Sequence, residues 1–337
     1  MNIVSELPTK KKQISHGHNL SVEFIRLLAC FGVISIHVHA NTLSASNLSG
    51  AFSIFCVPFF FSTGLVFFTS NLNNKTSVKS SLFKIWKRIG VPFVAWSTIY
   101  TCLIIAKSLL TGSNKAFTIY SLGRIYLYGE SSEHLYFLPE LIVMQIIILG
   151  IYLITTSSKP IIGVGLITIA MCYLAWGYMY GYYYITPVNS IIIYILVAII
   201  VSTRLKQIKN NWHYLVVGIV LITTSVFGTY FNTIKFLEMY LFSLPLGGIG
   251  LLLLTLCSPR TYLPKWILVA TSTTYGVYLS HVLFLEAIEF LIEKLHYKIF
   301  YDLDTKILMT SFIFIISILF VLIIKKIYLL RTLLLGE

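Results

Sequence analysis

Charged side chains are scarce in this chain. Asp, Glu, Lys and Arg together make up 11% of its 337 residues, whereas hydrophobic residues make up 57%. A soluble domain carries roughly 25% charged residues. The mean hydropathy of +0.85 is also far from that of a soluble domain. The sequence therefore predicts a polytopic membrane protein.

Cysteine is also rare, and two familiar patterns of catalytic chemistry are missing. The five cysteines are odd in number, lie far apart in apolar segments and include no C-x-x-C pair, so neither a disulfide framework nor a zinc site is expected. The chain has no G-x-S-x-G stretch, which argues against a serine hydrolase. We expect no metal site and no permanently bound cofactor.

Long apolar runs make up most of the sequence. A bilayer core needs about 20 apolar residues per helix, and such runs recur along the whole chain. They predict an all-α, polytopic helical bundle of about ten transmembrane helices. The membrane domain covers 20–330, between an N-terminal segment (1–19) and a tail (331–337). The ten predicted spans are 20–41, 51–69, 89–109, 135–156, 160–179, 187–203, 213–231, 237–257, 266–290 and 306–328.

The positive charge of the chain, +13 net, is sorted by side of the membrane. With the N-terminus in the cytoplasm, most Lys and Arg residues fall in alternate loops, which is the positive-inside pattern. This predicts that both termini are cytoplasmic, and it accounts for the basicity without a nucleic-acid partner. The predicted cytoplasmic cations are Lys10, Lys11, Lys12, Lys75, Lys79, Lys84, Lys87, Arg88, Lys159, Arg204, Lys206, Lys209, Arg260, Lys265, Lys325, Lys326 and Arg331. Lys306 is one of the few predicted on the other side.

The first span carries ionisable residues at a regular spacing. Arg26 and His37 are eleven residues apart, close to three helical turns, so they share one face about 16 Å apart along the axis. Glu23 precedes Arg26 by three residues, which is the spacing of an ion pair. Such groups are costly in a bilayer and indicate a polar site. The alternative is that Arg26 reaches the inner surface and His37 bonds between helices.

The second and third spans contain further candidates. In "VPFFFSTGLVFF" (57–68), Pro58 and Gly64 predict a broken helix in which nearby hydroxyls satisfy the freed backbone groups. A kinked, tightly packed helix is the alternative. Lys84, Lys87 and Arg88 precede the third span. Such a cluster can hold phosphate groups, although alone it is more often a topology anchor.

Three more ionisable residues gather where the fourth span begins, and one lies late in the chain. Glu133, His134 and Glu140 occur in "EHLYFLPELI", where carboxylates can tune or orient an imidazole for proton transfer. An interfacial polar patch is the alternative. His281 lies in "STTYGVYLSHVLFLEAI", inside the ninth span, as a further site residue or a helix-packing one.

These segments, taken in order, resemble the acyltransferase-3 family of bacterial membrane-bound O-acyltransferases, especially the subgroup related to the O-acetyltransferase of enterobacterial common antigen. The resemblance covers essentially the whole chain. It rests on the Arg26 and His37 pair with Glu23, "FFFSTGLVFF", "KRIGVP", "HLYFLP" and "TYGVYLSH". The chain departs from the family's usual pattern at Thr63, at Tyr136 in place of Trp, and in its basic cluster.

The resemblance implies transfer of an acyl group, commonly acetyl from acetyl-CoA, to a hydroxyl of a cell-envelope polysaccharide or lipid-linked glycan in the bacterial cytoplasmic membrane. His37 would be the general base. Arg26 and Glu23 would be catalytic residues with it, and the basic cluster, together with Arg26, would bind the donor phosphates. The remaining candidates would bind the acceptor or polarise the carbonyl; they are His134, Glu133, Glu140 and His281.

Two other functions and one other mechanism remain open at this stage. Buried Arg and His residues and helices broken by Pro or Gly also occur in transporters, so a glycan exporter or flippase is the main alternative. A scaffold in a polysaccharide synthesis complex is a third. Within the acyltransferase hypothesis, a histidine that itself carries the acyl group is an alternative to a general base.

Overall fold

The computed structural model describes residues 19–72, 77–112, 118–156, 159–180, 186–232, 237–258 and 262–337, with the side chains of 230–242 excluded. Nearly all of the predicted N-terminal segment lies outside these ranges, as do the predicted cytoplasmic cations Lys75 and Arg260. Within them, all regular secondary structure is helical.

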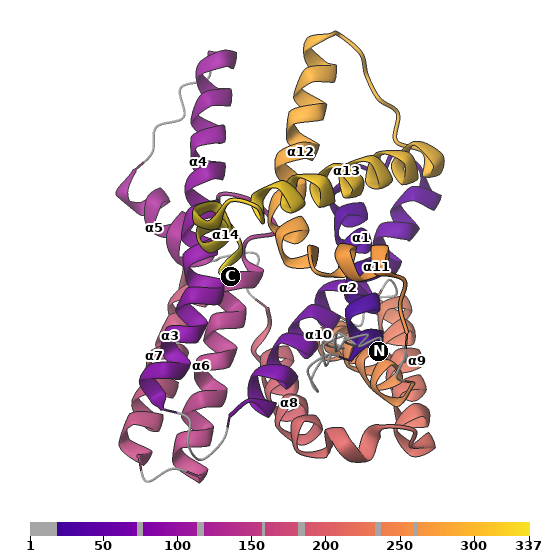
Figure 1. The fold of residues 1–337 in the computed structure, drawn as a ribbon. Coiled ribbons are helices and arrows are strands. Elements are labelled where there is room, and N and C mark those ends of the chain that lie inside the picture. The colour runs from indigo at the N-terminus through magenta and orange to yellow at the C-terminus, as the bar shows by residue number, and fades with distance from the viewer. Residues whose placement is uncertain are drawn as a thin grey trace, which may run out of the picture.

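Fourteen α-helices and one π-helical turn follow one another through the described part of the chain (Figure 1). Helices α6 and α7 lie side by side, as do α9 and α10, and α14 packs against α4. The elements are α1 (Leu20–His37), α2 (Leu43–Ser70), α3 (Val78–Ile85), the π-turn η1 (Trp86–Gly90), α4 (Val91–Thr111), α5 (Ile119–Tyr128), α6 (Phe137–Thr155), α7 (Pro160–Met179), α8 (Val188–Ile208), α9 (Trp212–Asn232), α10 (Leu237–Cys257), α11 (Lys265–Thr271), α12 (Thr274–Lys294), α13 (Leu303–Ile324) and α14 (Tyr328–Leu335).

The predicted all-α, polytopic membrane bundle is confirmed. In the part of the chain that the structure describes, nine helical stretches are long and apolar enough to cross a membrane. The predicted span 237–257 coincides with α10. This helix is not among the nine, because only its part Ser243–Cys257 is described in full, and that part is apolar but shorter than a membrane span. The cytoplasmic placement of both termini stays a prediction.

Several predicted boundaries are wrong, and local polar chemistry explains the largest error. The predicted ninth span, 266–290, is two helices, α11 and α12. Ser272 and Thr273 turn their hydroxyls back onto the carbonyls of Val269 and Ala270, both at 2.7 Å, which competes with helix continuation. Helix α2 also begins earlier than predicted, because Thr42 caps it by accepting the Ala45 amide.

Helix α2 runs through Pro58 without a break, which favours the alternative of one tightly packed helix. The Ser62 hydroxyl donates to the Pro58 carbonyl at 2.7 Å. Because proline has no N–H, the carbonyl of Ile54 loses its usual helical partner. Helix α10 meets α2 at this point through Gly247 and Gly248: a methyl group at Gly247 would lie 2.5 Å from the Ile54 oxygen. Small residues thus allow the two backbones to touch, as in other membrane helix pairs.

Replacing Gly248 by alanine is expected to destabilise the bundle. The added methyl would lie 2.2 Å from the backbone carbon of Pro58, so α10 has to move away from α2. Overpacking of this kind costs about 1–3 kcal/mol. Thermal unfolding in detergent measures it, with Gly50→Ala as the control, because a methyl at Gly50 meets nothing within 4 Å. Equal melting temperatures for the two variants would contradict the close contact.

Candidate active site

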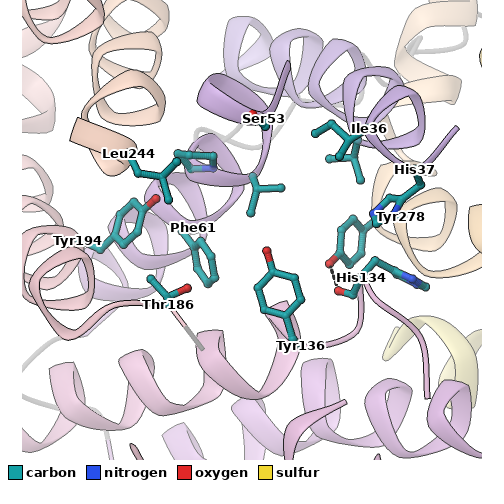
Figure 2. Close-up of a pocket in the computed structure, with 13 residues that line it drawn as sticks. Ile36, His37, Ser53, Phe61, His134, Tyr136, Thr186, Tyr194, Leu244 and Tyr278 are labelled. Carbon is teal, nitrogen blue, oxygen red and sulfur yellow. Dashed lines mark hydrogen bonds between the residues drawn. The ribbon is translucent and has the colours of Figure 1, made fainter. Parts of the chain in front are cut away.

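A cavity of about 220 Å³ lies inside the helix bundle. Figure 2 shows Tyr136 between Phe61 and Tyr278, with His37 and His134 on the Tyr278 side and Tyr194 and Thr186 across from them. The lining comes from five long helices and two connecting segments. The residues are Val33, Ile36 and His37 (α1), Ser53, Val57, Pro58 and Phe61 (α2), His134 and Tyr136 (before α6), Thr186 (before α8), Tyr194 (α8), Leu244 (α10) and Tyr278 (α12).

His37 stands where α1 ends. It is the last residue of the helix, and Val38 beyond it has extended backbone angles. The Nδ1 atom of His37 lies 3.9 Å from Oε2 of Glu133, whose side chain is 73% exposed. The His37 side chain is only 17% exposed. Its imidazole therefore faces the cavity on one side and a solvent-accessible carboxylate on the other.

Three histidines from separate segments form a cluster at this end of the cavity. The ring centroids of His37 and His134 are 6.0 Å apart, those of His37 and His281 are 5.3 Å apart, and those of His134 and His281 are 4.8 Å apart. The described residues contain no group of three or more His, Cys, Asp or Glu side chains arranged to hold a metal ion. Proton transfer is the chemistry that this imidazole cluster can support.

His134 has both ring nitrogens occupied. A carbonyl oxygen only accepts, so Nε2 of His134 donates to the Leu279 carbonyl at 3.3 Å, and Nδ1 accepts from the Ser132 hydroxyl at 2.9 Å. The Tyr278 hydroxyl also donates to the His134 carbonyl. Burial lowers the pKa of His134 well below its ordinary value, and the neighbouring imidazoles of His281 and His37 lower it further. His134 is therefore a neutral side chain fixed in place.

His281 has one ring nitrogen without a partner in the described part of the chain. Its Nδ1 donates to the carbonyl of Tyr278 at 2.7 Å, which leaves Nε2 with a lone pair. That Nε2 is buried and accepts no hydrogen bond from any described residue, and the residue as a whole is 0% exposed. His281 is not among the described residues that line the cavity. It therefore lies behind the lining. An unsatisfied buried acceptor beside His37 makes His281 a candidate for a role at the site.

Glu140 is bonded to Thr186, across the cavity from the histidine cluster (Figure 2). It is 3% exposed, and its carboxylate accepts from both the backbone amide and the hydroxyl of Thr186. Thr186 in turn lines the cavity, so Glu140 fixes the segment that leads into α8. Its carboxylate serves Thr186 and is not paired with His134.

Arg26 lies lower on α1 and outside the cavity. Its Nη1 pairs with Oε1 of Glu23 at 3.1 Å, as the spacing predicts, and its guanidinium lies 5.6 Å from the centre of the Phe67 ring. The described lining of the cavity ends at Val33 on this helix. Arg26 and His37 thus share a helix without sharing this cavity.

The basic cluster lies on the surface in an unusual backbone segment. Lys84 lies in the last turn of α3, and Lys87 and Arg88 belong to the π-turn η1; all three side chains are exposed. A π-turn inside a long helix frequently marks a functional site. Gly336, just beyond α14, sits against the Lys87 and Arg88 backbone, where an added methyl would lie 2.7 Å from the Arg88 carbonyl oxygen. These cations are not part of the histidine cluster.

Several cavity residues were not predicted as site residues from the sequence. They are Thr186, Tyr194, Tyr136 and Tyr278, of which the last two lie in segments that carry the family resemblance. One local signal for Tyr278 exists, since it precedes His281 by three residues, the spacing of neighbours on a helix face. Tyr194 and Thr186 carry no comparable signal, because only the packing of α8 brings them to the cavity.

Fold and site together define a multi-pass membrane protein with an imidazole cluster at a cavity inside its helices. The family model described as an acyltransferase domain, that of the acyltransferase-3 family, matches residues 19–326. The chain belongs to this family and is a membrane acyltransferase. No curated protein and no solved structure matched the chain. Its place in the enterobacterial common antigen subgroup stays a prediction.

Proposed function

We propose that this protein is an O-acyltransferase that moves an acyl group, most simply acetyl, from acyl-CoA to a hydroxyl of a cell-envelope polysaccharide or lipid-linked glycan. The observation that carries the proposal is the position of His37. It lines the cavity, has a carboxylate 3.9 Å from Nδ1, and lies beside the unpartnered Nε2 of His281.

In the proposed reaction His37 takes the proton from the acceptor hydroxyl while the oxygen of that hydroxyl attacks the thioester carbonyl. The new C–O bond forms and the C–S bond breaks. The proton on His37 then passes to the departing CoA thiolate, so the imidazole is neutral again at the end. General-base help of this kind contributes about 10²–10⁴-fold to a rate. Glu133, whose Oε2 lies 3.9 Å from Nδ1 of His37, can stabilise the imidazolium that forms in between, as the third member of a catalytic triad does. The ring of His281, 5.3 Å from that of His37 between centroids, directs no positive charge at it, and in this proposal its Nε2 lone pair assists electrostatically.

The cavity suits the reacting ends of two uncharged groups. Of its described lining residues none is Asp, Glu, Lys or Arg. The hydroxyls of Tyr136, Thr186 and Tyr194 can bond the hydroxyls of a sugar, and the Phe61 ring offers an apolar face. A thioester and a neutral sugar ring fit this lining better than a phosphate does, so the donor's phosphates belong elsewhere.

We place those phosphates at Lys84, Lys87 and Arg88. Lys and Arg bind phosphate oxygens through charge-assisted hydrogen bonds. The three side chains are exposed at and before the π-turn that leads into α4. Helix α4 is in turn held to α14, because the indole N–H of Trp96 donates a hydrogen bond to the Leu334 carbonyl. Arg26, with its Glu23 partner, is a further candidate for the same anion.

The double variant Lys87→Ala with Arg88→Ala is expected to raise the KM for acetyl-CoA about tenfold and to leave kcat within twofold, since charged hydrogen bonds contribute about 1.5–3 kcal/mol each and exposure weakens them. Steady-state kinetics at two salt concentrations measures this. The matched control removes one Arg and one Lys from exposed positions of α8, Arg204→Ala with Lys206→Ala. An unchanged KM, or an equal rise in the control, would place the donor elsewhere.

The proposed function is tested with purified protein in lipid nanodiscs, radiolabelled acetyl-CoA and envelope glycan. Label should enter the glycan only when protein, donor and glycan are all present. Mass analysis of the glycan from cells with and without the gene should show the same acyl group. A flippase or a scaffold predicts no donor binding and no label in the glycan, and that result would refute the proposal.

A further inference from the structure

Lys306 is a buried cation that the proposed reaction does not use. It lies in the first turn of α13, the most apolar of the candidate spans, and is 0% exposed. Among the described residues no carboxylate lies within ion-pair distance of its Nζ. A lysine in such a place is costly, and where it is kept it usually bonds backbone carbonyls and marks a functional site.

The carbonyls that Lys306 meets lie immediately beyond His37. Its Nζ donates to the carbonyl of Val38 and, at 3.5 Å, to that of His39. The last carbonyls of a helix lack partners within the helix, and a cation near them interacts favourably with the helix dipole. Lys306 therefore closes the C-terminal end of α1, the end that carries His37.

A second set of bonds joins the same two segments. The amide of Asn41 donates to the Tyr301 carbonyl at 2.9 Å, and the amide of Tyr301 donates to Oδ1 of Asn41 at 2.8 Å. Asn41, Tyr301 and Lys306 thus form a clasp between the end of α1 and the start of α13. The clasp holds the chain just beyond His37 against α13. Helix α2 holds the last turn of α1 as well, because the Ser49 hydroxyl donates to the backbone carbonyl of Ser35 at 3.3 Å.

We infer that Lys306 is a positioning residue for acyl transfer: through the carbonyls of Val38 and His39 it fixes the end of α1 and thereby the place of His37 at the cavity. The inference rests on the proposed function. A misplacement of about 1 Å in a catalytic group can cost about 10²-fold in rate, so a modest loosening of this helix end is sufficient to affect kcat. The bonds of Lys306 go to backbone groups, so an arginine can replace it in part whereas a methionine cannot.

The test compares Lys306→Met, Lys306→Arg and Lys298→Met, the last an exposed lysine in the segment before α13. Lys306→Met is expected to lower kcat at least fivefold with the KM for acetyl-CoA unchanged, Lys306→Arg to recover at least half of the loss, and Lys298→Met to equal the wild type. In a His37→Ala background Lys306→Met should lower kcat no further. Should Lys306→Met fail to fold, Asn41→Ala opens the clasp from an exposed position and should lower kcat about twofold.

Hydrogen exchange supplies a readout that is independent of activity. The peptide that covers 38–42 should exchange faster in Lys306→Met than in the wild type or Lys298→Met, because the Asn41 amide is bonded across the clasp. Unchanged exchange overturns the clasp, and faster exchange with wild-type kcat overturns the positioning role. If the wild type transfers no acyl group, the proposed function fails, and the exchange data still decide whether Lys306 holds this helix end.

Discussion

Replacing His37 by alanine is expected to slow acyl transfer to the glycan by about 10²–10⁴-fold, the usual contribution of a general base. No other described imidazole on the cavity can take over its role, because both ring nitrogens of His134 are occupied and His281 does not line the cavity. Transfer of labelled acetyl from acetyl-CoA to glycan by protein in nanodiscs measures the loss. Binding of acetyl-CoA should survive, since the proposed phosphate site is on α3 and η1.

His39 provides the matched control for this variant. It lies two residues beyond His37, its side chain is 71% exposed, and it does not line the cavity in the described structure. His39→Ala should retain the wild-type rate. If His37→Ala kept more than about a tenth of the activity at equal protein level, a loss too small for a missing general base, His37 would not be the base.

A second large effect is expected at His281, where two substitutions distinguish the role of its Nδ1 from that of its Nε2. Asparagine retains a donor near Nδ1 for the Tyr278 carbonyl but removes the acceptor at Nε2. Glutamine places an oxygen near the position of Nε2. If the buried Nε2 stabilises protonated His37, His281→Asn should lower kcat by about 10–10²-fold with little change in KM, and His281→Gln should lose less.

Steady-state kinetics of the two His281 variants, together with their melting temperatures, decides this point. Equal losses of kcat in both variants, accompanied by equal losses of thermal stability, would show that His281 only fills space between α12 and its neighbours. A rise in KM for the glycan would instead place His281 in direct contact with the acceptor.

The sequence predicted the class of fold and the outlines of most helices, because apolar runs of spanning length carry that information locally. It also predicted the Glu23–Arg26 ion pair, which depends only on the helical repeat. The errors arose where short-range polar bonds compete with the helix, as at Ser272 and Thr273. At Pro58 the sequence left a broken helix and a tightly packed one open, and the close packing against α10 is consistent with the second.

The site itself was only partly predictable. The candidate histidines were identified one by one, but their meeting at one cavity depends on the packing of α1, α12 and the segment before α6. The shared face of Arg26 and His37 suggested one passage, whereas the described cavity reaches only His37. Lys306 was assigned by charge to the outer side, and nothing in the sequence around it indicates that its ammonium group meets the end of α1.

A double-variant comparison tests most directly the claim that His37 and His281 perform one proton transfer. The rates of His37→Ala, His281→Asn and the double variant are measured with the same glycan and donor in the same membranes. If His281 acts only through His37, the double variant should be no slower than His37→Ala alone, because the losses of residues that act as a unit are not additive. Losses that multiply in the double variant would show two independent roles and contradict the account.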